Sequence, residues 1–273
     1  MQPELHPLRE ASLFYGVALG LALGLAALSP LLGHAVTLYT MQTPAIAVIV
    51  CRLVHTRGAS VGLAGLGLTR LGMRHWPMAL GLPLFGLLPG YMVVWGSGIG
   101  SFTLQDDVVW WQLAAHLMVS LIAGVFLGAM AEEIGWRGYL LPRLVPLFGP
   151  SRSGLLIGFL HGCWHLPLIF LTPFYNSEGP VAVTVPMFLV LVALAGPIFA
   201  QLRLTSGSIV PVALMHATWN TLWEFFAKTT QTSDRALVTL FAGESGIISV
   251  LMLGLIALWL ARRPPVLRAI DAA

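Results

Sequence analysis

Two neighbouring glutamates and an arginine lie within one hydrophobic stretch of this sequence, in the run AEEIGWRGYLLPRL that begins at Ala131. Glu133 and Arg137 are four residues apart, so on a helix they share a face in the acid-first order that favours an ion pair. Glu132 points about 100° away from that face and has no such partner on its own helix. An unpaired carboxylate in apolar surroundings is a suitable general base.

Histidines and an asparagine recur at the same helical spacing in two later hydrophobic stretches. These are His161 and His165 in FLHGCWHLP, and His216 and Asn220 in LMHATWN. At 1.5 Å per residue, Glu132, His165 and His216 lie roughly 12 to 18 Å below the cytoplasmic ends of their helices, as assigned below. Polar groups in a membrane span usually face a protein interior or a watery cavity, so this convergence predicts an intramembrane polar site.

Each of these features also has an ordinary structural explanation when it is taken alone. Glu133 with Arg137 can be a neutralised pair within a helix, and a single histidine in a span is often a hydrogen-bonded packing residue. That explanation accounts poorly for the whole set, because an unpaired glutamate, two histidines and an asparagine share one depth.

The composition places these residues in a membrane protein. Of the 273 residues, 57% are hydrophobic and 9% are charged, whereas an ordinary soluble domain has about 25% charged residues. So few charges cannot cover a soluble surface, and a water-soluble fold is excluded. The arginines are scattered and form no basic face, so we predict no nucleic-acid partner. Cys51 and Cys163 match no disulfide or metal pattern and are expected to be buried free thiols.

We predict an all-α, polytopic membrane protein that forms a single integral membrane domain over residues 1–273, with about eight transmembrane helices. The predicted spans are Ser12–Leu32, Ala35–Leu53, Trp76–Trp95, Trp110–Leu141, Gly154–Leu171, Val181–Leu202, Ser208–Phe226 and Ala242–Ala261. Glycines at four-residue spacing in two of these spans predict close helix packing. They are Gly16, Gly20 and Gly24 in the first span, and Gly154, Gly158 and Gly162 in the fifth.

The basic residues give the predicted orientation. With a cytoplasmic N-terminus, all of the 14 basic residues except Lys228 and Arg235 lie on the cytoplasmic side. The acidic Asp106, Asp107 and Glu178 then lie outside. We therefore expect both termini in the cytoplasm, the polar site toward the cytoplasmic side, and a location in the lipid bilayer of the plasma membrane.

Taken together, the three motifs resemble those of the type II CAAX prenyl endopeptidase and bacteriocin-processing family of intramembrane proteases. The resemblance covers about residues 110–226 and consists of EExxxR from Glu132, a histidine before Leu-Pro at His165, and HxxxN from His216. It implies an all-helical membrane core and an intramembrane endopeptidase. The family's second motif is usually FxxxH, whereas here His161 stands four residues before His165. His161 is either an aromatic exchange, which we favour, or an additional ligand beside the site.

The resemblance also implies roles for individual residues. Glu132 with His165 would position and deprotonate a water molecule, and His216 with Asn220 would donate hydrogen bonds to the oxyanion. Glu133 and Arg137 would be supporting residues that hold their helix in register.

The sequence leaves two versions of this chemistry open. The glutamate version requires no cofactor. In a zinc-dependent version, Glu132, His165 and His216 would bind the metal, with His161 close enough to be a further ligand. We favour the glutamate version because the motifs lack the compact HExxH arrangement, which supplies two ligands and a base from one helix.

The expected substrate is a membrane-associated peptide or protein, including a lipidated, CAAX-like peptide. Two other functions are considered. A transporter could use the same buried polar cluster as a relay, although the absence of repeat symmetry counts against it. A non-proteolytic adaptor or bacteriocin-immunity protein would carry the motifs without catalysis.

Overall fold

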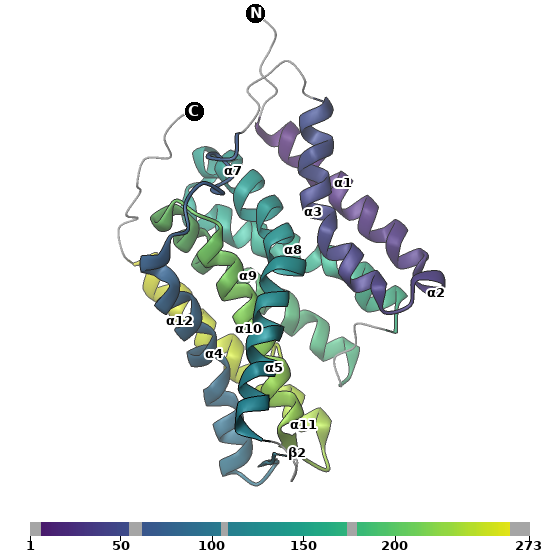
Figure 1. Cartoon of the computed structure of the whole chain (residues 1–273), viewed down its shortest axis with the longest axis vertical. Helices are drawn as coiled ribbons and strands as arrows, with labels where there is room; N and C mark the ends of the chain where they lie inside the picture. The colour runs from purple at the N-terminus through teal and green to yellow at the C-terminus, as the bar shows by residue number, and fades with distance from the viewer. Residues whose placement is uncertain (1–6, 55–61, 105–108, 174–178, 263–273) are drawn as a thin grey trace, which may run out of the picture.

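The computed structural model describes residues 7–54, 62–104, 109–173 and 179–262, and these residues are almost entirely helical (Figure 1). In chain order the elements are α1 (Pro7–Ala27), α2 (Ser29–Leu32), α3 (Ala35–Val54), η1 (Met73–His75), α4 (Trp76–Gly96), β1 (Ser101–Phe102), α5 (Trp110–Ala123), η2 (Gly124–Ala129), α6 (Met130–Glu133), η3 (Ile134–Leu140), α7 (Leu141–Phe148), α8 (Pro150–Leu171), α9 (Val181–Ser206), α10 (Val210–Lys228), β2 (Thr230–Gln231), α11 (Arg235–Ala242) and α12 (Ile247–Ala261). Strands β1 and β2 pair antiparallel, with Ser101 opposite Gln231. The prediction of an all-α fold is confirmed.

Seven helical segments among the described residues are long and apolar enough to span a membrane, so the protein is an integral membrane protein. They are Pro7–Ala27, Ala35–Val54, Met73–Gly96, Trp110–Phe148, Pro150–Leu171, Val181–Ser206 and Arg235–Ala261.

The predicted span Ser208–Phe226 is not among these seven. Most of its residues lie in the 19-residue helix α10, but His216, Asn220 and Glu224 lower the hydropathy of that helix. Helix α10 contacts α4, α5, η2 and α9, so other helices surround it. Its position in the bundle therefore depends on these contacts rather than on a continuous apolar surface.

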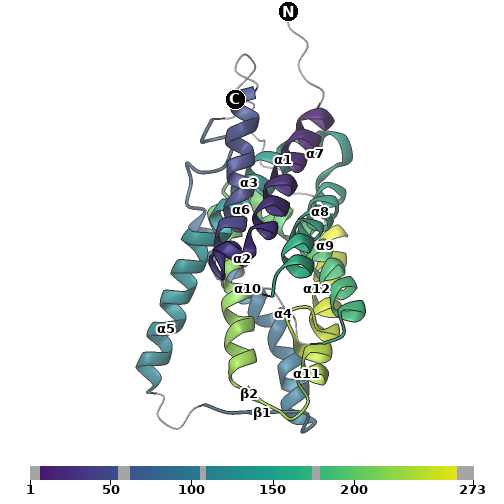
Figure 2. The ribbon, with the colours of Figure 1, turned by 90° about the vertical axis from the view of Figure 1, so that its right-hand side faces the viewer.

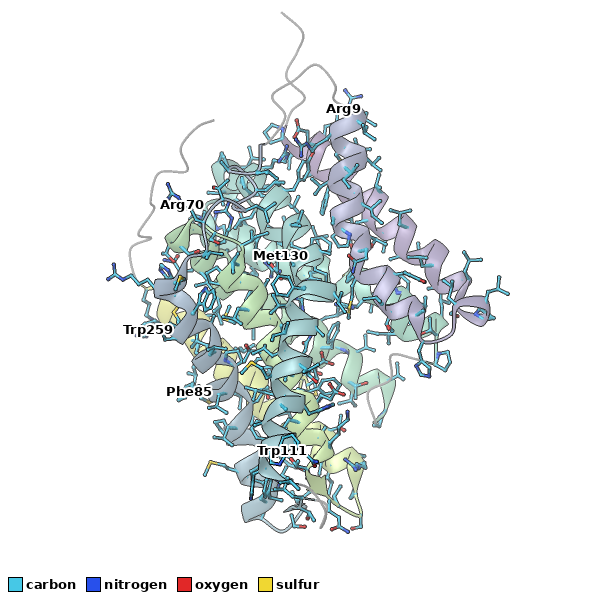
Figure 3. The ribbon with its side chains drawn as sticks, viewed as in Figure 1. Arg9, Arg70, Phe85, Trp111, Met130 and Trp259 are labelled. Carbon is cyan, nitrogen blue, oxygen red and sulfur yellow. The ribbon has the colours of Figure 1, made fainter. Side chains whose placement is uncertain are left out.

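Successive long helices run in alternating directions, so α1 begins and α12 ends toward the same end of the long axis (Figure 1). Arg9 and Arg70 lie toward this end and Trp111 toward the other, with Met130, the first residue of α6, between them (Figure 3). Asp106, Asp107 and Glu178, which we used to predict the orientation, lie outside the described residues.

Helices α8 and α9 pack in close backbone contact through glycines of α8. A Cβ atom at Gly154 would lie 2.7 Å from the Cα atom of Pro197. One at Gly162 would lie 3.0 Å from a methyl carbon of Leu189. The prediction of close packing is therefore confirmed for the glycines of the fifth predicted span.

The same prediction is wrong for α1. An added Cβ atom at Gly16, Gly20 or Gly24 would have no neighbour within 4 Å. Helix α1 instead buries its opposite face, which includes Phe14 and Ala18, against the core. The spacing of the glycines therefore did not identify the face of α1 that packs against the core.

The two neighbouring glutamates lie on a single α-helical turn, α6, between the π-helical segments η2 and η3. Interruptions of this kind are frequent at functional sites. Helix α3 contacts both π-helical segments, η2 and η3. Gln42 of α3 donates a hydrogen bond to the carbonyl oxygen of Leu127 in η2. A Cβ atom at Gly135 in η3 would lie only 2.5 Å from Cβ of Pro44.

Helix α5 stands apart from the other helices over its first turns (Figure 2). None of its residues is buried, and Trp110 and Trp111 at its start are exposed. This segment therefore presents apolar and aromatic side chains to the surroundings rather than to the core.

The close approach of α8 and α9 predicts that Gly158→Ala destabilises the protein. Its new methyl group would overlap the carbonyl oxygen of Val192 and lie 2.9 Å from Cα of Ala193. Such overpacking costs about 1 to 3 kcal/mol. Gly20→Ala is the matched control, because open space surrounds that position. Thermal unfolding in detergent should show a lower Tm for Gly158→Ala only, and an equal Tm for the two variants would contradict this account.

Candidate active site

The carboxylate of Glu133 binds two side chains, those of Arg137 and His216. Arg137 donates from Nη1 to both carboxylate oxygens, at 2.9 and 3.1 Å. The Nδ1 atom of His216 lies 3.0 Å from Oε1 of the same carboxylate. Glu133 and Arg137 are fully or almost fully buried. The predicted ion pair is thus confirmed, and His216 extends it from α6 and η3 to α10.

Glu132 has a different partner, which lies on another helix. Its Oε2 atom is 2.7 Å from Nε2 of His161 in α8, and both side chains are buried. The expectation that Glu132 lacks a partner is therefore wrong. The expectation rested on positions within one helix, whereas the contact joins residues 29 positions apart in the chain.

The imidazole ring of His161 stacks on two other rings. It stacks on Trp136 with ring centroids 5.0 Å apart, and on His165 with centroids 5.2 Å apart. His165 in turn meets Phe188 of α9 edge-on. These contacts agree in part with the interpretation of His161 as an aromatic exchange, since the ring packs as an aromatic residue would. The contact with Glu132 is an additional feature.

A cavity of about 220 Å³ opens beside these side chains and has mostly apolar walls. Six predicted site residues line it: Glu132, Arg137, His161, His165, His216 and Asn220. Glu133 lies behind Arg137 and His216, which it binds. The structure therefore brings the whole predicted set together, contributed by α6, η3, α8 and α10.

Three of these residues could also hold a metal ion. Glu132, His161 and His165 each offer one ligand atom, and these atoms lie within 4.8 Å of one another. Two histidines and a glutamate, with an open position for water, are a common donor set for catalytic zinc. The grouping differs from the one expected from the sequence, in which His216 was the third ligand. Here the Nδ1 atom of His216 contacts Glu133 instead.

Some contacts of the site could not be predicted from the sequence, or could be predicted only in part. The guanidinium of Arg137 lies 4.5 Å over the ring of Phe199 in α9, a cation–π contact that no motif predicts. His161 did have a signal, because it precedes His165 by one helical turn and therefore shares its face. That spacing places His161 near the site without identifying Glu132 as its partner.

Comparisons with known proteins find similarity in the part of the chain that carries these residues. The type II CAAX prenyl endopeptidase Rce1-like family matches residues 110–222, a range that contains all three motifs. The protein named CAAX prenyl protease 2 of Methanococcus maripaludis is 33% identical to this chain over 79 residues. That match covers 29% of this chain and 26% of the relative, so the chain spans about a quarter of the relative's length.

The buried ion pair predicts a large effect of Arg137→Met on stability. Removing one partner leaves the carboxylate of Glu133 as a buried charge with less compensation, which costs about 3 to 5 kcal/mol. The double variant Glu133→Gln with Arg137→Met should recover most of the loss, because the remaining amide can still bond to His216. The control is Arg143→Met, whose pair with Glu10 is partly exposed and should contribute less. Equal losses for the two arginine variants in reversible unfolding would contradict the assignment.

Proposed function

We propose that this chain, a member of the type II CAAX prenyl endopeptidase family over residues 110–222, is an intramembrane endopeptidase that hydrolyses a peptide bond with a water molecule activated by Glu132. The observation that supports this most is the meeting of Glu132, His165, His216 and Asn220 at one mostly apolar cavity. Packing alone does not require a carboxylate and three further polar side chains around one cavity.

In the proposed reaction, Glu132 is the general base. It removes a proton from a water molecule held between its carboxylate and His165, and the oxygen of that water attacks the carbonyl carbon of the scissile bond. Glu132 then returns the proton to the amine that leaves. Glu133 does not compete for this proton, because its carboxylate is engaged by Arg137 and His216.

His216 and Asn220 are the proposed donors to the oxyanion of the tetrahedral intermediate. They lie one helical turn apart on α10 and both line the cavity. With its Nδ1–H bound to Glu133, a protonated His216 would offer Nε2–H to the oxyanion. Two carboxylates, one guanidinium and one imidazolium would then make the buried cluster neutral, which reduces the cost of burying its charges.

The proposed substrate is a membrane-associated or lipidated, CAAX-like peptide. The cavity walls include Leu82, Phe188, Leu191 and Trp219, which would accept an apolar segment beside the reacting bond. Access from the cytoplasmic side or laterally from the bilayer fits the depth predicted for the site from the rise per residue. The relative from Methanococcus maripaludis is named CAAX prenyl protease 2.

The proposal places the protein in the plasma membrane as one domain with both termini in the cytoplasm. The support is the distribution of basic residues together with the even number of alternating long helices once α10 is included (Figure 1). The arginine-rich end of the molecule would then face the cytoplasm.

A zinc-dependent form of the same protease is the second candidate, and the grouping of Glu132, His161 and His165 favours it. These three residues would hold the ion, whose chemistry is to lower the pKa of a bound water and to polarise the carbonyl group. Glu132 would then be a ligand rather than the base.

The glutamate mechanism predicts different effects of two substitutions on cleavage of a lipidated reporter peptide by purified protein. Glu132→Gln should nearly abolish cleavage, because the amide cannot accept the proton. Asn220→Ala should retain residual activity, lower by about 100- to 1,000-fold, because one oxyanion donor is lost. Glu10→Gln, at a residue that does not line the cavity, is the matched control. Full activity of Glu132→Gln with the fold intact would exclude the mechanism.

Metal removal separates the two candidates. The glutamate mechanism predicts that protein treated with a chelator and dialysed, with zinc far below one ion per chain by elemental analysis, cleaves the reporter at the untreated rate. Loss of cleavage that is restored by added Zn²⁺ would instead establish the zinc-dependent form.

A further inference from the structure

His161 is the one member of the polar cluster that the resembled motif does not include, since the family pattern has phenylalanine at this position. We propose that His161 is a positioning residue that donates Nε2–H to Oε2 of Glu132 and leaves Oε1 as the oxygen that accepts the proton from water. The inference rests on the proposed function, because it assigns the immediate partner of the proposed base.

The hydrogen-bonding of the ring identifies its tautomer. Among the described residues, Nδ1 of His161 is buried and has no hydrogen-bond partner. A proton on Nδ1 would therefore be a buried donor without an acceptor, which costs more than leaving a bare ring nitrogen. The proton lies instead on Nε2, which is 2.7 Å from Oε2 of Glu132. A carboxylate oxygen there is an acceptor, so the bond runs from His161 to Glu132.

The ring cannot easily turn away from this contact. Trp136 and His165 both stack on it, with ring centroids 5.0 and 5.2 Å away. The helix that carries it is itself fixed, because α8 packs against α9 through Gly158 and Gly162. A donor held on a second helix therefore fixes the carboxylate of Glu132, which a flexible glutamate on one helical turn does not achieve alone.

Packing and donation are two separable properties of His161. A phenylalanine ring would keep the stacking on Trp136 and His165 but would offer no N–H to the carboxylate. A glutamine would lose the ring but would place an amide N–H at a similar reach. The two substitutions therefore have opposite predicted consequences for the orientation of Glu132.

The experiment measures steady-state cleavage of the lipidated reporter by His161→Phe and His161→Gln. We expect His161→Phe to lower kcat roughly 10- to 100-fold, the range for losing a hydrogen bond to a charged group, with KM unchanged. His161→Gln should recover most of kcat. His116→Phe, the same exchange on the exposed helix α5, is the matched control and should match the wild type.

A second measurement does not depend on cleavage. The ring ¹⁵N resonances of histidine-labelled protein, assigned to His161 by their loss in His161→Gln, should show a protonated Nε2 and a bare Nδ1. If the wild type cleaves no peptide, the proposed function fails while this tautomer still tests the inference.

The inference is overturned by an Nδ1–H tautomer, by wild-type kcat in His161→Phe, or by equal losses in both variants. Zinc bound by the wild type and lost in His161→Phe would also overturn it, because the ring would then be a metal ligand.

Discussion

The arrangement of the polar residues at the cavity depends on one interaction, the binding of the Glu133 carboxylate by both Arg137 and His216. A charge buried in an apolar bundle is tolerated only when it is paired and hydrogen-bonded. Glu133 meets this condition twice, through Arg137 on its own helical segment and through His216 on α10. The contact therefore joins two helices and orients His216 at the cavity. The preceding residue, Glu132, contacts a different helix, α8, through His161.

The surrounding helices constrain the same centre by shape. Glycines of α8 let its backbone approach α9, which places His161 and His165 opposite α6. On the other side, the close contact of Gly135 with Pro44 sets η3 against α3. Between these contacts, η2 and η3 place a single α-helical turn that carries both glutamates. Small residues at these positions thus contribute to the site as directly as its polar side chains do, although they contact no reacting group.

Contacts within one helix could be predicted from the sequence, and contacts between helices could not. The pair Glu133 and Arg137 follows from helical geometry, and the shared depth of the polar residues follows from the rise per residue. The partner of Glu132 depends on the rotation of α8, which spacing does not determine. For the same reason the glycines of α1 were assigned to packing although they face open space. Helix α10 shows another limit: the predicted span Ser208–Phe226 does correspond to a long helix, but that helix is not among the segments apolar enough to span a membrane on their own.

The central claim is that a peptide bond is hydrolysed at Glu132, and isotope labelling of the product tests it most directly. A lipidated peptide incubated in H₂¹⁸O with protein in lipid vesicles should yield a fragment with ¹⁸O in its new carboxyl group, measured by mass spectrometry. The account predicts labelled product for the wild type and none for Glu132→Gln. Equal amounts of labelled product from both proteins, or uptake of intact peptide into the vesicles without cleavage, would contradict it.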